Sequence, residues 1–329
     1  MSTSIMNDAK RVSAEKSFRA FTFVISLLYG AVLCSLPNEN FFDHANYLIF
    51  AENAWDQLVA FWTISPVIAI VNEPIWLLLN SALALLLEPD AVVRVIIFSS
   101  ASTFALRMTR CSSKWIAVVL LMLFMPMVVK NFLIHIRQGT AIAIFMWGWF
   151  CPRPKVRWAL MAISPFVHTS FAFILLLLAL AKIALRLRLG PTLRGFLFGG
   201  IGVSIGLGLG WLAAVVGARQ AEEYTFGASG ISGLGFLIWA VIFMLMCLEG
   251  RRFLKKHSFE SAIIMFYLGT YFFVEVTARI FESGIPVVLL AILQMRGWKR
   301  NTSLLVLGAV TLLQWSGRLS EPMLGFGIA

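Results

Sequence analysis

Apolar runs separated by short basic clusters repeat along the whole chain of 329 residues. About 20 apolar residues in a helix are enough to cross a lipid bilayer. The pattern predicts spanning helices over residues 21–36, 115–129, 139–150, 196–216, 231–248, 261–277, 285–293 and 304–315. Residues 57–87 and 91–106 are expected to form a hairpin or a re-entrant pair. The charge pattern does not fix the number of membrane crossings within residues 37–106. We therefore expect about 10–12 transmembrane or re-entrant helices.

One apolar run is interrupted in its middle. Residues 158–181 are long enough for one span, but both flanks are basic and Pro165 lies near the centre. Proline breaks a helix, and non-helical backbone at membrane depth is tolerated only where it lines a cavity. We expect two half-helices that meet at an outward-facing turn over residues 164–170.

Composition excludes a soluble domain. Hydrophobic residues make up 60% of the chain and charged residues only 13%, with a mean hydropathy of +0.86. Soluble domains carry about 25% charged residues. The chain is predicted to be an all-α polytopic integral membrane protein with a single transmembrane domain, residues 1–329. The first apolar run has no small-residue cleavage site after it and is interpreted as a retained span.

The net charge of +11 is distributed as in a membrane protein and does not predict nucleic-acid binding. Most of the 27 Lys and Arg residues fall in six clusters between apolar runs, at 10–19, 107–114, 153–157, 182–194, 251–256 and 296–300. Such clusters mark cytoplasmic loops that face anionic membrane lipid. Residues 1–19 are accordingly expected to be a cytoplasmic tail. Seven of the 16 acidic residues lie between Glu39 and Asp90, which predicts an external acidic loop at 37–72.

Few ionisable or polar residues remain once the basic clusters are set aside, and such residues inside a membrane are functional candidates. The map drawn from Lys and Arg alone places all of them on the external side; they are Asp43, Tyr47, Glu73, Arg137, Gln138, His168, Tyr224, Arg279 and Glu282. Each also has a structural interpretation, such as a solvated loop residue, a helix-terminal carboxylate or an interfacial arginine. Lys130, Arg94, Arg219 and Arg318 are assigned to the interface. The four Cys residues form no CxxC pair, so neither a disulfide framework nor a metal site is predicted.

An ordered set of short motifs resembles the EpsG family, Wzy-like polymerases of exopolysaccharide, capsule and O-antigen. The motifs run from about residue 40 to 290 and are Asp43 with Tyr47, Asn72-Glu73-Pro74-Ile75-Trp76, Ile136-Arg137-Gln138-Gly139-Thr140, His168-Thr169-Ser170 and Arg279. Gly139 departs from the family pattern, in which a larger apolar residue is expected.

The resemblance implies a metal-independent glycosyltransferase without a cofactor and with a GT-C-like fold. Such enzymes lie in the bacterial cytoplasmic (inner) membrane, with the active site facing the periplasm or exterior. They join repeat units carried on undecaprenyl diphosphate, so a lipid-linked glycan donor, a lipid-linked acceptor and membrane lipid are the expected partners. A chain-length regulator is a further partner that the resemblance implies.

This reaction requires a group that stabilises a departing diphosphate and a base that deprotonates a sugar hydroxyl. Arginine binds phosphate oxygens bidentately and stays charged, so Arg137 and Arg279 are expected at the diphosphate. Gln138, Tyr47, Tyr224 and Glu282 are further candidates for substrate binding. Asp43 and His168 rank ahead of Glu73 as the base. Trp55, Trp62 and Trp76 are candidates for stacking on sugar rings.

Three other classes fit the sequence less well. A lipid-linked oligosaccharide flippase or another transporter would place matching broken helices in two halves of the chain, and only 164–170 is clearly broken. An O-antigen ligase would use the same Arg and His residues, so these residues do not separate it from a polymerase. A long external loop late in the chain would favour the ligase. A membrane acyltransferase would bring a nucleophile or a His pair on the cytoplasmic side, and neither is evident.

Overall fold

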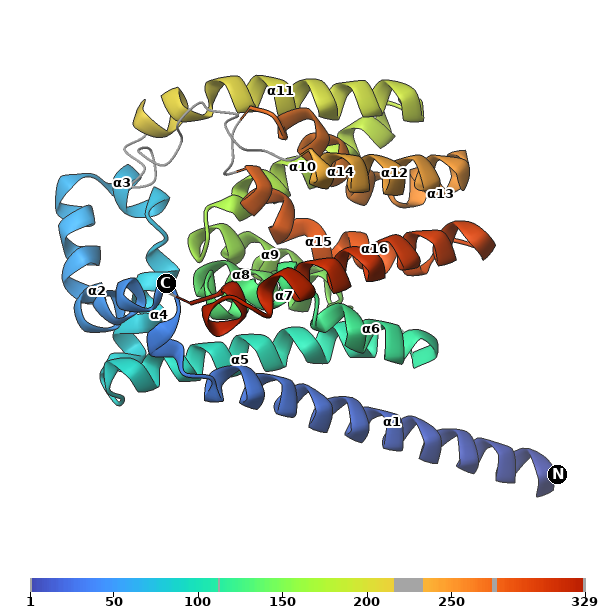
Figure 1. The fold of residues 1–329 in the computed structure, drawn as a ribbon, viewed down its shortest axis with the longest axis horizontal. Helices are drawn as coiled ribbons and strands as arrows, with labels where there is room; N and C mark the ends of the chain where they lie inside the picture. Colours follow the sequence, from blue (N-terminus) through green and yellow to red (C-terminus); the bar gives the residue numbers. More distant parts are fainter. Residues whose placement is uncertain (1, 112, 216–232, 274–276, 328–329) are drawn as a thin grey trace.

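The computed structural model describes residues 2–111, 113–215, 233–273 and 277–327. Every element within these ranges is a helix, except for an isolated β-bridge between Phe41 and Gly327. The all-α prediction is confirmed. Figure 1 shows most of the long helices running roughly parallel or antiparallel, with α1 and α11 on opposite sides of the bundle.

The first half of the chain contains α1 to α8. Their bounds are α1 Ser2–Ser35, α2 His44–Ile64, α3 Pro66–Val71, α4 Pro74–Ala84, α5 Pro89–Arg110, α6 Ile116–Leu123, α7 Pro126–Leu133 and α8 Ile136–Trp149. Helix α5 packs against α1, α2 and α8, so it forms the centre of this half.

The second half contains α9 to α16. Their bounds are α9 Pro154–Ile163, α10 Ser170–Arg186, α11 Pro191–Val215, α12 Leu234–Leu248, α13 Arg251–Lys256, α14 Ser258–Thr270, α15 Thr277–Leu293 and α16 Gly297–Arg318. Helix α14 contacts α10, α11, α12 and α15, and α15 also contacts α8. The two halves therefore meet mainly along α8, which packs against α9 as well as α15.

Two described helices are long and apolar enough to cross a membrane by length and composition, Ser13–Ser35 and Pro89–Arg110. The pair Ser113–Leu123 and Pro126–Leu133, bent by 66°, adds a third if it forms one broken span. Other apolar helices are shorter, such as α4 and α12. Prolines partly explain why these helices are short, because α3, α4 and α7 each begin at a proline that ends the preceding apolar run.

The expected break at 164–170 is present. Helix α9 ends at Ile163, a 3-10 turn covers Ser164–Phe166, and α10 begins at Ser170. The segment 37–72, expected as a loop, is instead largely helical, since α2 and α3 occupy most of it. The expected hairpin arm at 57–87 is likewise divided, at Ser65 and again at Glu73.

The basic clusters gather at one end of the bundle. The guanidinium carbon of Arg107, at the end of α5, lies 3.4 Å from the ring centre of Trp147 at the end of α8. Arg300, at the start of α16, lies 4.2 Å from the ring centre of Trp115 before α6, and Lys299 donates to the carbonyl of Leu248 at the end of α12. We call this end, where α5, α8 and α12 finish, the basic end.

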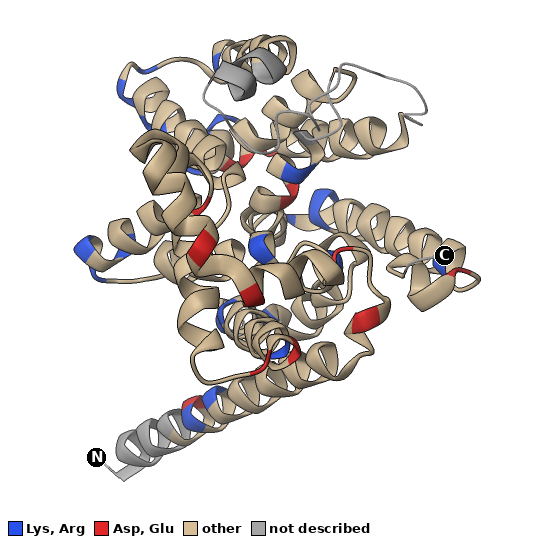
Figure 2. Ribbon diagram, turned by 90° about the vertical axis from the view of Figure 1, so that its left-hand side faces the viewer, with Lys and Arg blue, Asp and Glu red and all other residues tan. Residues whose placement is uncertain are grey.

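The opposite end of the bundle is where α8, α10 and α15 begin, and we call it the site end. Helix α2 and the start of α4 lie beside it, at the left of Figure 1. Figure 2 views the molecule from this end and shows acidic and basic positions close together near the centre.

Candidate functional site

Glu73 is the buried centre of a polar cluster at the site end. It caps the N-terminus of α4 with a left-handed backbone, φ 62° and ψ 56°, directly before Pro74. This conformation is unfavourable for a residue with a side chain and costs about 1 to 3 kcal/mol. The side chain is only 1% exposed. Surrounding contacts must therefore hold Glu73 in place.

Both carboxylate oxygens of Glu73 accept hydrogen bonds from residues distant in sequence. Arg137 Nη1 donates to Oε2 at 2.5 Å, from the first turn of α8. His168 Nδ1 lies 2.8 Å from Oε1, and the backbone N–H of Thr169 donates to the same oxygen at 3.2 Å. The contacts thus join α4, α8 and the break before α10. Because a carboxylate only accepts, His168 presents a protonated Nδ1 to it.

An aromatic cluster fixes the start of α8, where Arg137 lies. The hydroxyl of Tyr47 donates to the carbonyl of Ile134 at 2.9 Å and accepts from the N–H of Ile136 at 3.0 Å. Trp76 and Phe50 pack edge-on against each other, with Tyr47 beside both. The guanidinium carbon of Arg137 lies 5.3 Å from the ring centre of Phe50. The turn that presents Arg137 is therefore anchored from α2.

These contacts change two expectations. Tyr47 is not a loop residue, since it lies on α2 and is 3% exposed. Trp76 is 1% exposed and packed among aromatic rings, so it cannot stack on a sugar. Trp55 and Trp62 are 59% and 50% exposed and line an open groove with Pro74, the residue after Glu73.

Gly139 has a steric reason to depart from the family pattern. A Cβ built on it would lie 2.2 Å from the carbonyl oxygen of Asn131 on α7. Any side chain would therefore force α7 and α8 apart. This close approach allows the short turn between α7 and α8, and that turn determines the position of Arg137.

Arg279 lies in the first turns of α15, next to the same region of α8. Gln138 Nε2 donates to the carbonyl oxygen of Arg279 at 2.8 Å, and Ser283 Oγ donates to it at 3.1 Å. Ser283 also shares a 2.8 Å hydrogen bond with Ser170 of α10. Gln138 thus positions the backbone of α15 through its amide.

Asp43 forms the more open side of the cluster. It is the N-cap residue of α2, but its side chain makes no capping hydrogen bond, and Oδ2 lies 3.7 Å from Nδ1 of His135. Its side chain is 38% exposed. Burial alone would raise the pKa of Asp43, but His135, together with the charges of Arg137 and Arg279, holds this pKa below its ordinary value. The carboxylate is therefore ionised and electrostatically coupled to both arginines.

Several helix N-termini surround this cluster. Asp43, Glu73 and His135 are the N-cap residues of α2, α4 and α8. Thr169 caps α10, and Arg279 lies near the start of α15. Helix N-termini carry partial positive charge and free N–H groups, which favour anions. Arg137 and Arg279 add charged donors for an anionic group, while the carboxylates of Glu73 and Asp43 offset part of their charge.

Glu282 lies outside this cluster, one helical turn after Arg279. Its Oε1 pairs with Lys130 Nζ of α7 at 2.6 Å, and both residues line a cavity of about 170 Å³ between α7, α12, α15 and α16. Glu282 Oε2 and Gln314 Oε1 are buried without a hydrogen-bond partner in the described chain. Lys130 therefore has a partner in the protein core and is not simply an interfacial residue.

Tyr224, a predicted substrate contact, lies outside the described residues. Within the described ranges, no three His, Cys, Asp or Glu side chains form a group that could hold a metal ion.

Sequence reasoning missed His135 and did not recognise the role of Lys130. His135 lies two residues before Arg137, and a second polar residue so close to a candidate arginine was the available signal. Its partner Asp43 is 92 positions away, so the contact itself depends on the fold.

Comparison with known families matches the EpsG family over residues 20–315. No curated protein and no solved structure matches the chain. The matched region contains the whole polar cluster and nearly every helix described above. The chain therefore belongs to the EpsG family and is a polysaccharide polymerase-like membrane protein.

Proposed function

We propose that this protein polymerises oligosaccharide repeat units carried on undecaprenyl diphosphate, on the outer face of the bacterial cytoplasmic membrane. The observation that carries the proposal is the convergence of Arg137, Arg279 and several helix N-termini beside the open carboxylate of Asp43. A lipid diphosphate is strongly anionic and gains charge as it departs. Fixed positive groups at that position lower the barrier to its departure.

In the proposed step, a hydroxyl of the acceptor sugar attacks the anomeric carbon of the donor glycan. A new glycosidic C–O bond forms, and the bond from the anomeric carbon to the diphosphate breaks. Arg137 and Arg279 bind the departing diphosphate, so the positive charge needed is supplied without a divalent metal. The hydroxyl proton passes to Asp43.

Asp43 is chosen as the base because it is the most accessible candidate. Its side chain is 38% exposed, whereas those of His168 and Glu73 are 10% and 1% exposed. Both Glu73 oxygens are also occupied by hydrogen bonds. We assign Glu73 and His168 to positioning Arg137. The polar cavity at Lys130 and Glu282 is the proposed place for sugar hydroxyls, because it holds two unpartnered acceptors next to the helix turn of Arg279.

The test is to delete the gene, restore it with variants, and separate surface glycan and lipid-linked intermediates on a gel. Arg137→Ala, Arg279→Ala and Asp43→Asn should each reduce polymer synthesis by about 10²- to 10³-fold, with single repeat units still reaching the surface. Glu15→Gln, in an exposed ion pair at the opposite end of α1, is the matched control and should retain full activity. Repeat units trapped on the cytoplasmic side would instead indicate a flippase.

A further inference from the structure

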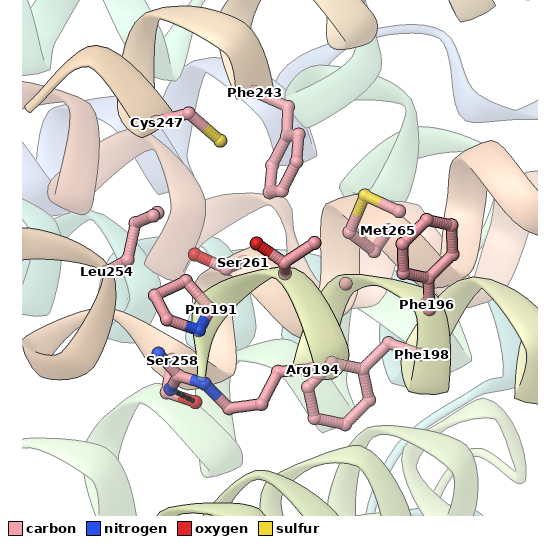
Figure 3. A pocket seen from close by; sticks show the side chains of 12 residues that line it. Pro191, Arg194, Phe196, Phe198, Phe243, Cys247, Leu254, Ser258, Ser261 and Met265 are labelled. Atoms are coloured by element: carbon pink, nitrogen blue, oxygen red, sulfur yellow. Dashed lines mark hydrogen bonds between the residues drawn. The ribbon is translucent and has the colours of Figure 1, made fainter. Parts of the chain in front are cut away.

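A second cavity, at the basic end, is lined by a buried arginine that has no acidic partner among the described residues. The cavity has a volume of about 360 Å³ and is lined by α11, α12, α13 and α14. Its size falls in the range of small-molecule pockets. Arg194 of α11 lies at one side, while Phe243, Cys247 and Met265 lie across the cavity from it (Figure 3).

Arg194 is only 5% exposed, and no carboxylate of the described chain pairs with it. Nη1 donates to the hydroxyl of Ser258 at 2.6 Å, and Nε has no hydrogen-bond partner in the described chain. The carboxylate of Glu260, two residues after Ser258 in the sequence, is instead paired with His257 at 3.1 Å. A buried unpaired charge destabilises a protein, so an anion that binds here removes a penalty.

Further groups at this side of the cavity also favour an anion. Ser258 begins α14, a helix of 13 residues, and Pro191 begins α11, a helix of 25 residues. Both helix N-termini therefore lie beside Arg194. Arg194 is itself a buried cation whose Nε–H has no acceptor in the described chain, and this is independent evidence for an anion site. The hydroxyl of Ser258 completes the polar side.

The rest of the cavity is apolar. Phe198, Phe243, Leu254 and Met265 line it, and Phe196, which is 76% exposed, lies at its rim. Helix α13, which lines the cavity through Leu254, also carries four exposed basic residues; they are Arg251, Arg252, Lys255 and Lys256. A ligand that fits must combine an anionic head with a hydrocarbon tail. Basic residues next to such a site attract the headgroups of anionic lipids.

We propose that this cavity binds one anionic phospholipid, with its phosphate on Arg194 and Ser258 and part of an acyl chain against Phe243 and Met265. The site lies at the basic end, so it is separate from the polar cluster around Glu73 and does not depend on the proposed polymerase reaction. Bound lipid would neutralise Arg194 and join α11 to α12 and α14.

The experiment uses delipidated full-length protein in detergent and phosphatidylglycerol as the probe. Native mass spectrometry counts retained lipid, and thermal unfolding reports stabilisation. Diacylglycerol lacks the phosphate and inorganic phosphate lacks the chain, so together they separate the two parts of the ligand. One phosphatidylglycerol should be retained and should raise the melting temperature, while the two partial ligands should do neither.

Two variants test the site in different ways. Arg194→Gln removes the charge, so it should weaken lipid retention at least tenfold and make the lipid-free protein more stable. Gly195→Leu leaves Arg194 intact and fills the cavity, since a Cβ at Gly195 meets only Met265 Cε at 3.9 Å. It should weaken retention similarly.

Matched controls are available on the same segment. Gly200 has open space around its Cβ position and does not line the cavity, and Arg186 is an exposed member of the same basic cluster. Gly200→Leu and Arg186→Gln should retain the lipid as the unmodified chain does. If Arg194→Gln and Gly195→Leu also retain it, or if inorganic phosphate stabilises equally well, the lipid proposal is overturned. Should Arg194→Gln fail to fold, Gly195→Leu still decides the question.

Discussion

A single carboxylate organises the candidate site at the scale of residues. Glu73 is buried, has an unfavourable backbone conformation, and accepts hydrogen bonds from Arg137, His168 and Thr169. Breaking a buried ion pair on one side leaves the other charge uncompensated, which is more damaging than removing both. The Glu73–Arg137 ion pair should therefore stabilise the fold, and Arg137 should in addition be needed for activity.

A double-mutant cycle can distinguish these two contributions. Glu73→Gln and Arg137→Gln should each destabilise the protein by about 3 kcal/mol, because each leaves one buried charge unpaired. The double variant should recover most of this loss, since the side-chain oxygen introduced by Glu73→Gln can still accept from His168. Polymer synthesis should remain absent in the double variant, because the diphosphate contact is gone.

Thermal unfolding in detergent and polymer gels provide the two readouts. Recovery of polymer synthesis in the double variant would contradict a role of Arg137 in binding the diphosphate. A double variant no more stable than the single variants would contradict the coupling.

The candidate residues could be predicted from the sequence, but their contacts could not. Glu73, Arg137 and His168 stand out because ionisable residues are rare in apolar runs. Their pairing spans 64 and 95 positions and depends on how the helices pack. Tyr47 was expected as a substrate contact, yet its hydroxyl bonds the backbone around His135, which only the fold reveals.

At the scale of elements, close helix approach determines where the site residues lie. Gly139 lets α8 begin directly against α7, with the Asn131 carbonyl where a side chain would otherwise be. The turn between the two helices contains His135, and Arg137 follows in the first turn of α8. A larger side chain at Gly139 should therefore disturb both the α7–α8 packing and the position of Arg137.

Gly139→Ala should destabilise the protein by about 1 to 3 kcal/mol, as expected for overpacking, and should reduce polymer synthesis. Gly308→Ala on α16 is the matched control, because nothing lies near its Cβ position. Alanine there should be neutral or slightly stabilising, since glycine is unfavourable inside a helix. Equal melting temperatures for both variants would show that the α7–α8 contact is looser than described.

Apolar runs predicted helices well and helix ends poorly. The break between α9 and α10 was expected because Pro165 interrupts a single run. The division of 37–87 into α2, α3 and α4 was not, although Pro66 and Pro74 mark both later helix starts. The acidic residues of this segment suggested an external loop, whereas helix packing against α5 and α4 stabilises α2.

At the scale of the whole molecule, charge is segregated along the bundle. Basic clusters meet where α5, α8 and α12 finish, and the polar cluster lies where α8, α10 and α15 begin. Basic loops face the cytoplasm in bacterial membrane proteins. The site end should therefore face outward.

Cysteine labelling in intact cells tests this orientation. In a variant lacking the four native cysteines, Asp43→Cys should react with an impermeant thiol reagent from outside. Lys155→Cys, at an exposed position in the basic first turn of α9, should react only after lysis. The reverse pattern would place the site in the cytoplasm and exclude the proposed reaction there.

The most direct measurement uses purified protein in lipid vesicles supplied with a single lipid-linked repeat unit. We predict glycans of two or more repeat units, release of undecaprenyl diphosphate, unchanged activity in EDTA, and a loss of about 10²-fold or more in Asp43→Asn. Repeat units that cross the bilayer without being joined, or equal polymer from Asp43→Asn and the unmodified chain, would contradict the account.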